Sequence, residues 1–383
     1  MRYLILGAGQ QGRAIAFDLL RDGDNEVILA DNDADLLEDV YSWLDDPRAD
    51  LEPLDASNRE EVRAVMEDAD VVINALPYAF NLDVTTDAIA AGRSVVDLGG
   101  NNDVVAAQLE LDAEAREAGI IVIPDCGLAP GLANILASDA VDRLSRVESV
   151  RIRVGGLPQR PQGELDYMLT FNVEGLLNEY GEPAIAVRDG DAVQVEPLMD
   201  VERLNFPDPW GELEAFNTSG GLSTLPRTLG HKVENMDYKT LRYPGHAEKI
   251  RALYDQGLFS REPRETSNGT VVPRDLLAKM IENNCTYPEA DVVLLRITAL
   301  GMKGSVPLMV RSQIIDRFDK ENGITAMMRM TGYPASIIAQ MIARGDVTER
   351  GVVPGERAVN KEILRVELKA RDIVLEEIVK VVE

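Results

Sequence analysis

The first third of the chain alternates short apolar runs with stretches whose apolar residues recur at helical spacing. The runs are rich in Val and Ile, and Gly or Asp stands at most of their ends, which is typical of buried strands. Strands that alternate with helices in this way predict an α/β fold, a doubly wound parallel sheet covered on both faces. The expected strands are residues 2–6, 26–30, 51–54, 71–75, 94–98 and 120–124, and the expected helices are residues 11–21, 59–67, 84–91 and 106–118.

The pattern changes after about residue 147, where Gly, Pro, Asn and Asp become frequent between short strand-like runs. This change predicts a second domain, of the α+β kind, built on a mixed sheet. Residues 324–345 are helical in pattern again, and residues 361–382 indicate a helix followed by a strand-like tail. We expect one domain from residues 1–130 plus roughly 331–383 and another from residues 131–330. The strands expected in the second domain are residues 150–154, 167–173, 184–187, 193–195, 292–300 and 307–312.

The loop after the first expected strand has the pattern Gly-x-Gly-x-x-Gly and leads into an expected helix. In this context the three glycines permit a tight turn, close approach of a pyrophosphate and close packing of helix on strand. The phosphates would lie at the helix N-terminus, where free N–H groups favour an anion. The loop therefore predicts a Rossmann dinucleotide site, with contacts from Gly7, Gly9, Gln10, Gln11 and Gly12.

Asp31 closes the second expected strand, about 20 residues after the glycine loop. A carboxylate at this place accepts hydrogen bonds from the ribose hydroxyls and repels a 2′-phosphate, so NAD is predicted and NADP is disfavoured. Ligands of such sheets bind beyond the carboxyl ends of the strands, where this chain has small and polar residues. The further expected cofactor contacts are Asn74, Ala75, Leu76, Asp97, Leu98 and Gly99.

The composition of the chain excludes several classes of partner. The chain has 39 Lys and Arg against 66 Asp and Glu, a formal net charge of −27, which argues against nucleic acid or an anionic membrane as a partner. No apolar run is long enough to cross a membrane, and the two cysteines fit a reducing, cytoplasmic location. The His and Cys spacings of metal sites do not occur, so no metal is expected. The acidic excess suits a salt-rich cytoplasm, although the preference for Arg over Lys also fits a GC-rich genome.

Seven blocks of sequence, taken in order, resemble the saccharopine dehydrogenase family and, within it, the lysine 6-dehydrogenases. No single block is diagnostic, but their order along most of the chain is specific. Cys126 and residues 260–287 depart from the resemblance. The blocks are residues 71–76 (VVINAL), 94–100 (SVVDLGG), 123–131 (IPDCGLAPG), 215–224 (AFNTSGGLST), 237–249 (DYKTLRYPGHAEK), 315–326 (IDRFDKENGITA) and 337–351.

The resemblance implies an NAD-dependent oxidoreductase that acts on the CH–NH group of an amino acid. The first expectation is oxidative deamination of L-lysine at its ε-carbon. The alternatives are a saccharopine dehydrogenase, a carboxynorspermidine-type enzyme or, in another class, an NAD-binding redox sensor without turnover. The expected partners are an amino-acid substrate and further copies of the chain, in a homodimer or a larger homo-oligomer.

Hydride transfer from a carbon that bears nitrogen needs a neutral amine, whereas a free lysine amine has a pKa of about 10.4. A base or an apolar pocket must therefore remove the proton. Asp125, at a strand end beside the expected nicotinamide, is one candidate, with a helix N-cap as the alternative role. His246 is another, because it lies in a block that resembles the family, and Lys239 is a third if burial lowers its pKa.

The carboxylate of the substrate is best held by an arginine, whose fork of donors matches two carboxylate oxygens. Lys239 and Arg242 are three residues apart on an expected strand and so face opposite sides, which lets only one of them reach the substrate. Arg242 is the predicted carboxylate ligand. Thr218 and Ser219 precede two glycines and supply hydroxyls, with an ordinary glycine turn as the alternative, and Tyr78 is expected to line the pocket.

Overall fold

Two units divide the chain in the computed structural model, which describes residues 1–382. The first comprises Met1–Asp139 and Met328–Ile373, and the second comprises Ala140–Met327 and the residues from Val374 onward. The sequence placed the C-terminal tail with the first domain. Instead its strand, β18 (Leu375–Val381), forms a ladder with β16 (Val306–Arg317) of the second unit, and residue 383 lies outside the described part.

The first unit is built on a seven-stranded sheet in the order β17-β6-β5-β4-β1-β2-β3, and every neighbouring pair in it is parallel. This confirms the predicted doubly wound sheet. Apart from the edge strand β3, its strands are rich in Val and Ile and almost wholly buried, because helices cover both faces. The strands are β1 (Arg2–Leu6), β2 (Glu26–Asp31), β3 (Ala49–Pro53), β4 (Val71–Asn74), β5 (Ser94–Asp97), β6 (Ile121–Ile123) and β17 (Gly351–Val352).

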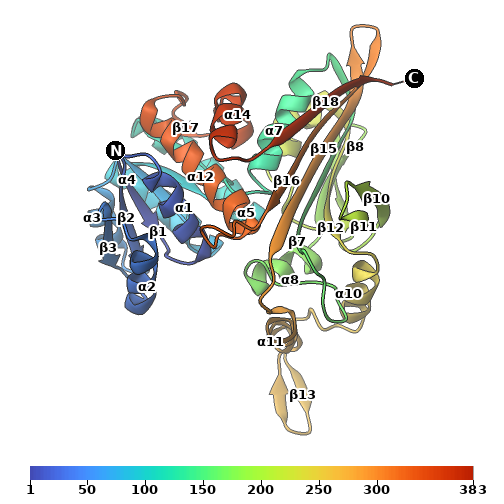
Figure 1. Cartoon of the computed structure of the whole chain (residues 1–383), viewed down its shortest axis with the longest axis horizontal. Coiled ribbons are helices and arrows are strands. Elements are labelled where there is room, and N and C mark those ends of the chain that lie inside the picture. The colour runs from blue at the N-terminus through green and yellow to red at the C-terminus, as the bar shows by residue number, and fades with distance from the viewer. Residues whose placement is uncertain (383) are drawn as a thin grey trace. The chain divides into compact units, whose positions relative to one another are not determined.

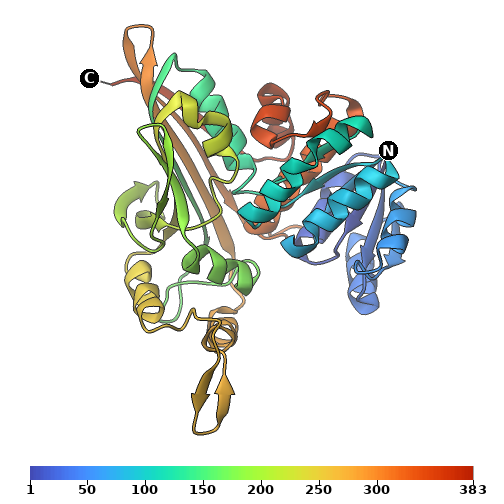
Figure 2. The same cartoon turned by 180° about the vertical axis from the view of Figure 1, so that it is seen from behind.

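The helices of this unit pack on the sheet from both sides, as the two opposite views show (Figures 1 and 2). Gly332 brings one of them close to α1, since a Cβ at Gly332 would lie 3.0 Å from the Cβ of Ala14. The stretch expected as one helix over residues 106–118 forms two. The helices are α1 (Gln10–Leu20), α2 (Ala34–Leu44), α3 (Arg59–Met66), η1 (Tyr78–Phe80), α4 (Asn81–Ala91), α5 (Asn102–Glu110), α6 (Asp112–Glu117), α7 (Leu132–Asp142), α12 (Ala326–Arg344), α13 (Gly355–Ala358) and α14 (Lys361–Ala370).

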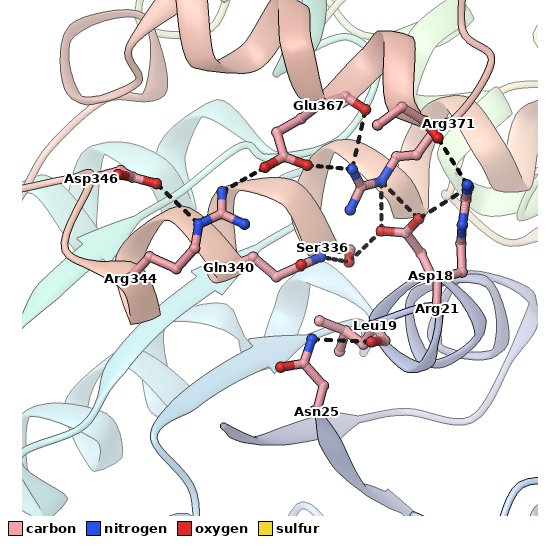
Figure 3. A network of polar contacts seen from close by, with 11 residues as sticks. Asp18, Leu19, Arg21, Asn25, Ser336, Gln340, Arg344, Asp346, Glu367 and Arg371 are labelled. Atoms are coloured by element: carbon pink, nitrogen blue, oxygen red, sulfur yellow. Dashed lines mark hydrogen bonds and ion pairs between the residues drawn. The ribbon is translucent and has the colours of Figure 1, made fainter. Parts of the chain in front are cut away.

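A buried ionic network joins three of these helices (Figure 3). Asp18 of α1 accepts hydrogen bonds from Nε of Arg371 at 2.7 and 2.8 Å and from the hydroxyl of Ser336 in α12 at 2.7 Å. Glu367 of α14 binds Arg371 at 2.6 Å and Arg344 at 2.7 Å. Because each buried charge has an opposite partner, the network fixes α12 and α14 against the helix that begins at the glycine loop.

The second unit holds a mixed, nine-stranded sheet in the order β10-β11-β12-β7-β15-β16-β18, with β8 pairing β12 and β9. Among the described pairs of this second sheet, only β12 and β7 run parallel. This confirms the expected mixed-sheet domain. The strands not yet given are β7 (Arg146–Pro158), β8 (Ala184–Arg188), β9 (Asp191–Val195), β10 (Glu202–Phe206), β11 (Gly211–Asn217), β12 (Val233–Arg242) and β15 (Asp291–Lys303).

Residues 167–173 were expected to form a strand, and this prediction was wrong. The segment is irregular and ends where a helix begins at Val173, and its side chains pack into a core with that helix instead of pairing. The unit also contains a projecting two-stranded hairpin, which stands away from the sheet in Figure 1. These elements are α8 (Val173–Gly181), α9 (Leu225–Leu229), η2 (Gly230–Lys232), α10 (His246–Asp255), β13 (Arg264–Thr266), β14 (Gly269–Val271) and α11 (Pro273–Cys285).

Candidate cofactor pocket and substrate site

The glycine loop has the geometry that its sequence predicts. Gly7 has a φ of +101°, and its N–H donates to the carbonyl of Ala30 at 2.7 Å. A Cβ at Gly12 would lie 1.8 Å from the carbonyl oxygen of Gly7, so no side chain fits there. Nothing lies within 4 Å of the position that a Cβ at Gly9 would take, which leaves the backbone open to a ligand. No side chain caps α1 and its first turn, from Gln10, has no acid, so its N–H groups suit an anion.

A pocket of about 290 Å³ lies at the carboxyl ends of β1, β2 and β4, beside this loop. The carboxylate of Asp31 accepts a hydrogen bond from the N–H of Ala8 at 2.7 Å and another from Asp33 at 3.0 Å. The pocket has two acids and no Lys or Arg among the described residues that line it. These lining residues are Leu6, Gly7, Ala30, Asp31, Asn32, Leu54, Asp55, Ala56, Leu76, Pro77 and Phe80.

Asp97 organises the neighbouring strand ends. It is buried and accepts hydrogen bonds from the N–H groups of Gly99 at 2.7 Å and Asp125 at 3.1 Å, and from Gln108 at 2.7 Å. Burial raises the pKa of Asp97, and these hydrogen bonds oppose the shift. The side chain of Asn74 likewise accepts from the N–H of Leu76, at 3.2 Å. Asp97 and Asn74 therefore shape the loops whose backbone the sequence assigned to cofactor contacts.

Asp125 lies directly on one of those loops. A Cβ at Gly99 would lie 2.0 Å from Oδ1 of Asp125, so the carboxylate occupies the space that the glycine leaves. Its own φ is +59°, and α7 begins only at Leu132, so the helix N-cap that the sequence offered as an alternative is wrong. Tyr78 is partly exposed, with its Cβ 3.3 Å from the Cβ position at Gly100. Cys126 is buried, and burial raises the pKa of its thiol, which is typical of a structural cysteine.

In the second unit a chain of hydrogen bonds connects three buried side chains. Nε of Arg242 donates to the hydroxyl of Tyr180 at 2.8 Å, and that hydroxyl lies 3.0 Å from Nε2 of His246. Nδ1 of His246 lies 2.9 Å from the carbonyl oxygen of Leu165. A carbonyl only accepts, so Nδ1 carries a proton, and because burial keeps the ring neutral, Nε2 accepts from Tyr180. The donor and the acceptor of each hydrogen bond from Arg242 through Tyr180 to His246 are therefore assigned.

His246 is consequently a neutral ring held in place by its neighbours. Burial and then the charge of Arg242 lower the pKa of His246 to about 3. The ring stacks on Phe216, with centroids 6.2 Å apart, and both of its nitrogens are engaged. The catalytic role expected from the sequence stays a prediction, and the contacts favour a positioning role, in which His246 and Tyr180 orient Arg242.

Arg242 is buried and forms no ion pair with an Asp or Glu within 4 Å among the described residues, although Glu179 is near enough for the two charges to interact. Its Nη1 donates to the carbonyl of Leu241 at 2.9 Å. The guanidinium lies over the ring of Tyr167, 4.8 Å from its centroid. Buried charges are ordinarily paired, and Arg153, for example, binds both Asp237 and Glu202. Arg242 differs from Arg153 in that it forms no ion pair among the described residues.

Glu179 is a candidate that sequence reasoning missed. It is partly buried at the end of α8, and its backbone carbonyl accepts from the N–H of Ser219 at 2.9 Å. Burial raises the pKa of its carboxyl to about 7, although the nearby charge of Arg242 opposes the shift. A carboxyl that titrates near neutral pH suits general acid–base chemistry. Nothing in the local sequence signals it, because the shift comes from segments distant along the chain.

The remaining expected residues fall into two groups. The hydroxyls of Thr218 and Thr240 lie 2.7 Å apart, and Ser219 donates to the carbonyl of Asn178 at 3.1 Å, so both predicted hydroxyls already have protein partners. Lys239 is on the opposite face of β12 from Arg242, where its Nζ donates to the backbone carbonyl of Asp200. The structure therefore brings Arg242 and His246 together and keeps Lys239 apart from them.

The fold and the glycine loop define a two-unit protein of the NAD(P)-binding class. Residues 3–123 match the family described as saccharopine dehydrogenase NADP binding domain, and residues 127–372 match the saccharopine dehydrogenase C-terminal domain. The chain belongs to the saccharopine dehydrogenase family. This confirms the expected family and its dehydrogenase class.

Among named relatives, saccharopine dehydrogenase [NADP(+), L-glutamate-forming] of Saccharomyces cerevisiae is 26% identical over 296 residues, which cover 75% of this chain and 65% of that protein. The Pyricularia oryzae protein of the same name is 21% identical, over 83% of this chain and 86% of its own length. Mouse mitochondrial alpha-aminoadipic semialdehyde synthase is 22% identical, over 97% of this chain and 47% of its own length. The chain thus spans less than two thirds of the yeast relative and about half of the mouse relative.

Two solved structures share the fold along nearly the whole chain. Apo saccharopine dehydrogenase (L-Glu forming) from Saccharomyces cerevisiae superposes with a TM-score of 0.81 at 22% identity and covers 100% of both chains. Homospermidine synthase from Legionella pneumophila, in complex with NAD, superposes with a TM-score of 0.71 at 13% identity. The match covers 99% of this chain and 91% of that chain. The yeast and Pyricularia oryzae relatives carry the name saccharopine dehydrogenase, so the narrower expectation of a lysine 6-dehydrogenase is not confirmed. No helix in residues 1–382 is long and apolar enough to cross a membrane.

Proposed function

We propose that the protein is an NAD(P)-dependent dehydrogenase that oxidises the secondary amine of a saccharopine-type amino acid. In the reaction the bound dinucleotide accepts a hydride from the carbon next to nitrogen. Water then splits the resulting C=N bond to an aldehyde and a primary amine, with release of one proton. The observation that carries the proposal is Arg242, a buried cation that forms no ion pair among the described residues and lies in the domain that matches the family.

The residues of the second unit have complementary tasks in this reaction. Arg242 binds a carboxylate of the substrate, and the hydrogen-bonded chain through Tyr180 to His246 holds the guanidinium in one orientation. Glu179, ionised at neutral to alkaline pH, takes the proton from the substrate ammonium so that the nitrogen lone pair is available. The proposal thus gives the base to Glu179 in place of the neutral His246.

A second candidate, oxidation of L-lysine at its ε-carbon, is favoured by the number of suitable cations. Arg153 is buried but already pairs with Asp237 and Glu202, and Arg274 pairs with Glu174. Of these three arginines, Arg242 is the one that forms no ion pair among the described residues, which suits a substrate with one carboxylate, whereas saccharopine carries more. The family relationship weighs more heavily, so lysine remains the alternative.

The cofactor proposed is NAD, although the yeast and fungal relatives are named as NADP enzymes. Asp31 and Asp55 line the pocket beside the glycine loop, and no cation lines it within the described residues. A 2′-phosphate there would meet two carboxylates and no positive charge. This supports the preference that Asp31 indicated from the sequence.

The proposal is tested by incubating the purified chain with NAD or NADP and either saccharopine or L-lysine, and following the absorbance of reduced nicotinamide. Turnover of saccharopine with NAD is expected. A signal with lysine alone would replace the first candidate by the second. Tight NAD binding without turnover on any amino acid would instead identify a redox sensor.

The role of Arg242 is tested with Arg242→Gln, and the exposed Arg203→Gln of the same unit is the control. Loss of the carboxylate contact should raise KM and lower kcat/KM by about 100-fold, since charge-assisted bonds in such sites are worth roughly 1.5–3 kcal/mol. An Arg242→Gln protein with unchanged kcat/KM would remove the carboxylate-binding role.

A further inference from the structure

Glu214 of β11 is a buried carboxylate that the proposed reaction does not use. Its surface is 2% exposed, and its two oxygens accept hydrogen bonds from the N–H of Gly245 at 2.8 Å and the N–H of Ala247 at 2.7 Å. These two residues stand on either side of His246, the first residue of α10. Glu214 therefore holds the backbone of His246 from both sides.

The contact supplies the cap that α10 lacks. An N-cap residue ordinarily accepts the N–H of the second or third helical residue with its own side chain, but the N-cap of α10 is Gly245, which has none. Ala247 is the second residue of the helix, so Glu214 forms the usual capping bond from a neighbouring strand. Arg203 approaches the same carboxylate only to 4.0 Å and is 51% exposed, so the N–H groups provide the main contact.

Glu214 is also the direct cross-strand neighbour of Arg242. The antiparallel ladder of β11 and β12 places the two residues opposite each other, and the side chains of such a pair lie on the same face of a sheet. Both are buried, yet they form no ion pair among the described contacts, because the carboxylate is turned to α10 and the guanidinium to Tyr180 and Leu241. An ion pair would engage the donors that a substrate carboxylate needs.

We propose that Glu214 is a positioning residue of the substrate site. By binding the N–H groups of Gly245 and Ala247 it holds the ring of His246 against Tyr180, and because its charge is engaged there, it leaves Arg242 available to a carboxylate of the substrate. Glu214 acts through these neighbours and is not itself a catalytic residue. The inference rests on the proposed function for the task of Arg242, whereas the placement of His246 can be measured without turnover.

Nitrogen NMR of the imidazole rings tests the placement of His246 in the full chain. The chain has two histidines, so His231→Gln assigns the two sets of signals. In the wild type His246 should carry its proton on Nδ1 and stay neutral from about pH 8 to about pH 5, where a histidine with the ordinary pKa of about 6.5 becomes charged.

Glu214→Gln keeps the shape of the side chain but replaces one acceptor oxygen by an amide donor, so one of the two backbone contacts is lost. The ring of His246 should then mix its two tautomers or become charged within this pH range. An unchanged His246 signal in Glu214→Gln would overturn the positioning role.

Asp291→Asn is the matched control for this spectrum. Asp291 is an equally buried acid that caps another helix in the same way, through the N–H groups of Ala326 at 2.7 Å and Met327 at 2.9 Å. Its substitution should lower Tm by a similar amount and leave the signal of His246 unchanged. A shift of His246 in both variants would assign the effect to general loosening of the fold and contradict the proposal.

Hydrogen exchange of the wild-type chain tests the contact without any substitution. The first N–H groups of a helix have no partner within the helix and exchange quickly unless another group binds them. The amides of Gly245 and Ala247 should therefore be protected from exchange. Rapid exchange of both amides would overturn the proposal even if Glu214→Gln does not fold.

Steady-state kinetics test the consequence for Arg242. Glu214→Gln should raise KM for the amino-acid substrate about tenfold and change kcat by less than about threefold, because the guanidinium is misplaced and the base Glu179 is retained. Glu212→Gln, at a 57% exposed acid of the same strand, should keep both constants. An unchanged KM in Glu214→Gln contradicts the link to Arg242, whereas failure of the proposed function would appear as absence of turnover in the wild type.

Discussion

Glu179 provides the most direct test of the chemistry at the residue scale. Burial raises the pKa of its carboxyl to about 7, so the base is protonated in acid and kcat/KM should rise as the pH increases through about 7. In Glu179→Gln the rise of kcat/KM with pH should disappear, and kcat/KM should fall by about 100-fold or more, the usual contribution of a general base. The measurement is the pH profile of kcat/KM for both proteins.

The control for this experiment is Glu182→Gln, an exposed acid just beyond the same helix, which should keep the wild-type profile. The raised pKa of Glu179 also makes the stability of the fold depend on pH. A carboxyl whose pKa is raised from 4.5 to about 7 stabilises the fold fully below pH 4.5 and loses this contribution as the pH rises through about 7. A Glu179→Gln profile that still rises through pH 7 would assign the base to another group.

Asp31 is the residue at which the proposed preference for NAD can be tested. Asp31→Ser should raise the ratio of kcat/KM with NADP to that with NAD at least about tenfold, roughly 1.4 kcal/mol, because a charge that repels the 2′-phosphate is removed. The matched control is Asp35→Ser, an exposed acid in the first turn of α2. If the ratio stays constant in Asp31→Ser, another feature of the pocket sets the preference.

The sequence identified residues whose function depends on backbone geometry better than those whose function depends on burial. Gly7, Gly12 and Asp31 could be placed because a tight turn and a strand end are local features. Glu179 could not, since its pKa depends on packing between distant segments. The alternation of a strand correctly separated Lys239 from Arg242, but the neutral state of His246 needed its three-dimensional neighbours.

At the scale of elements, the parallel sheet was the most predictable part of the molecule. Strands buried on both faces show as continuous apolar runs, and β1, β2, β4 and β5 lie within one residue of their expected bounds. Residues 167–173 also carry several apolar side chains, but they pack in a core formed mainly by helices and do not pair in a sheet. The final strand was assigned to the wrong domain because its pairing with β16 links segments that are remote in sequence.

The network around Asp18 predicts how strongly the helices of the first unit depend on one another. Asp18→Asn removes the buried partner of Arg371 and should lower the free energy of unfolding by about 3–5 kcal/mol, the cost of leaving a buried charge uncompensated. Asp346→Asn, at the partly exposed end of the same network, should cost less than about 1 kcal/mol. Denaturant titration measures both free energies of unfolding. If the two substitutions lower this free energy equally, the buried pair of Asp18 and Arg371 contributes no more to stability than the partly exposed pair of Arg344 and Asp346.

At the scale of the whole molecule, the charge of −27 opposes both ligands proposed for it. A dinucleotide and an amino acid with carboxylates approach a protein whose overall field repels them. Attraction must come from local features, namely the open N–H groups of α1 and the guanidinium of Arg242. The absence of any cation from the described lining of the dinucleotide pocket makes this contrast sharper.

Salt should therefore improve both stability and dinucleotide affinity. Between 0.1 M and 1 M salt the screening length falls from about 10 Å to about 3 Å, which suppresses long-range repulsion but leaves hydrogen bonds at the glycine loop intact. We expect Tm to rise and the Kd of NAD to fall as sodium chloride is added. Sodium sulfate at equal ionic strength separates screening from solute exclusion, which stabilises any compact protein. If Tm and Kd stay constant in chloride and Tm rises only in sulfate, self-repulsion is not a significant term, because exclusion alone then accounts for the gain.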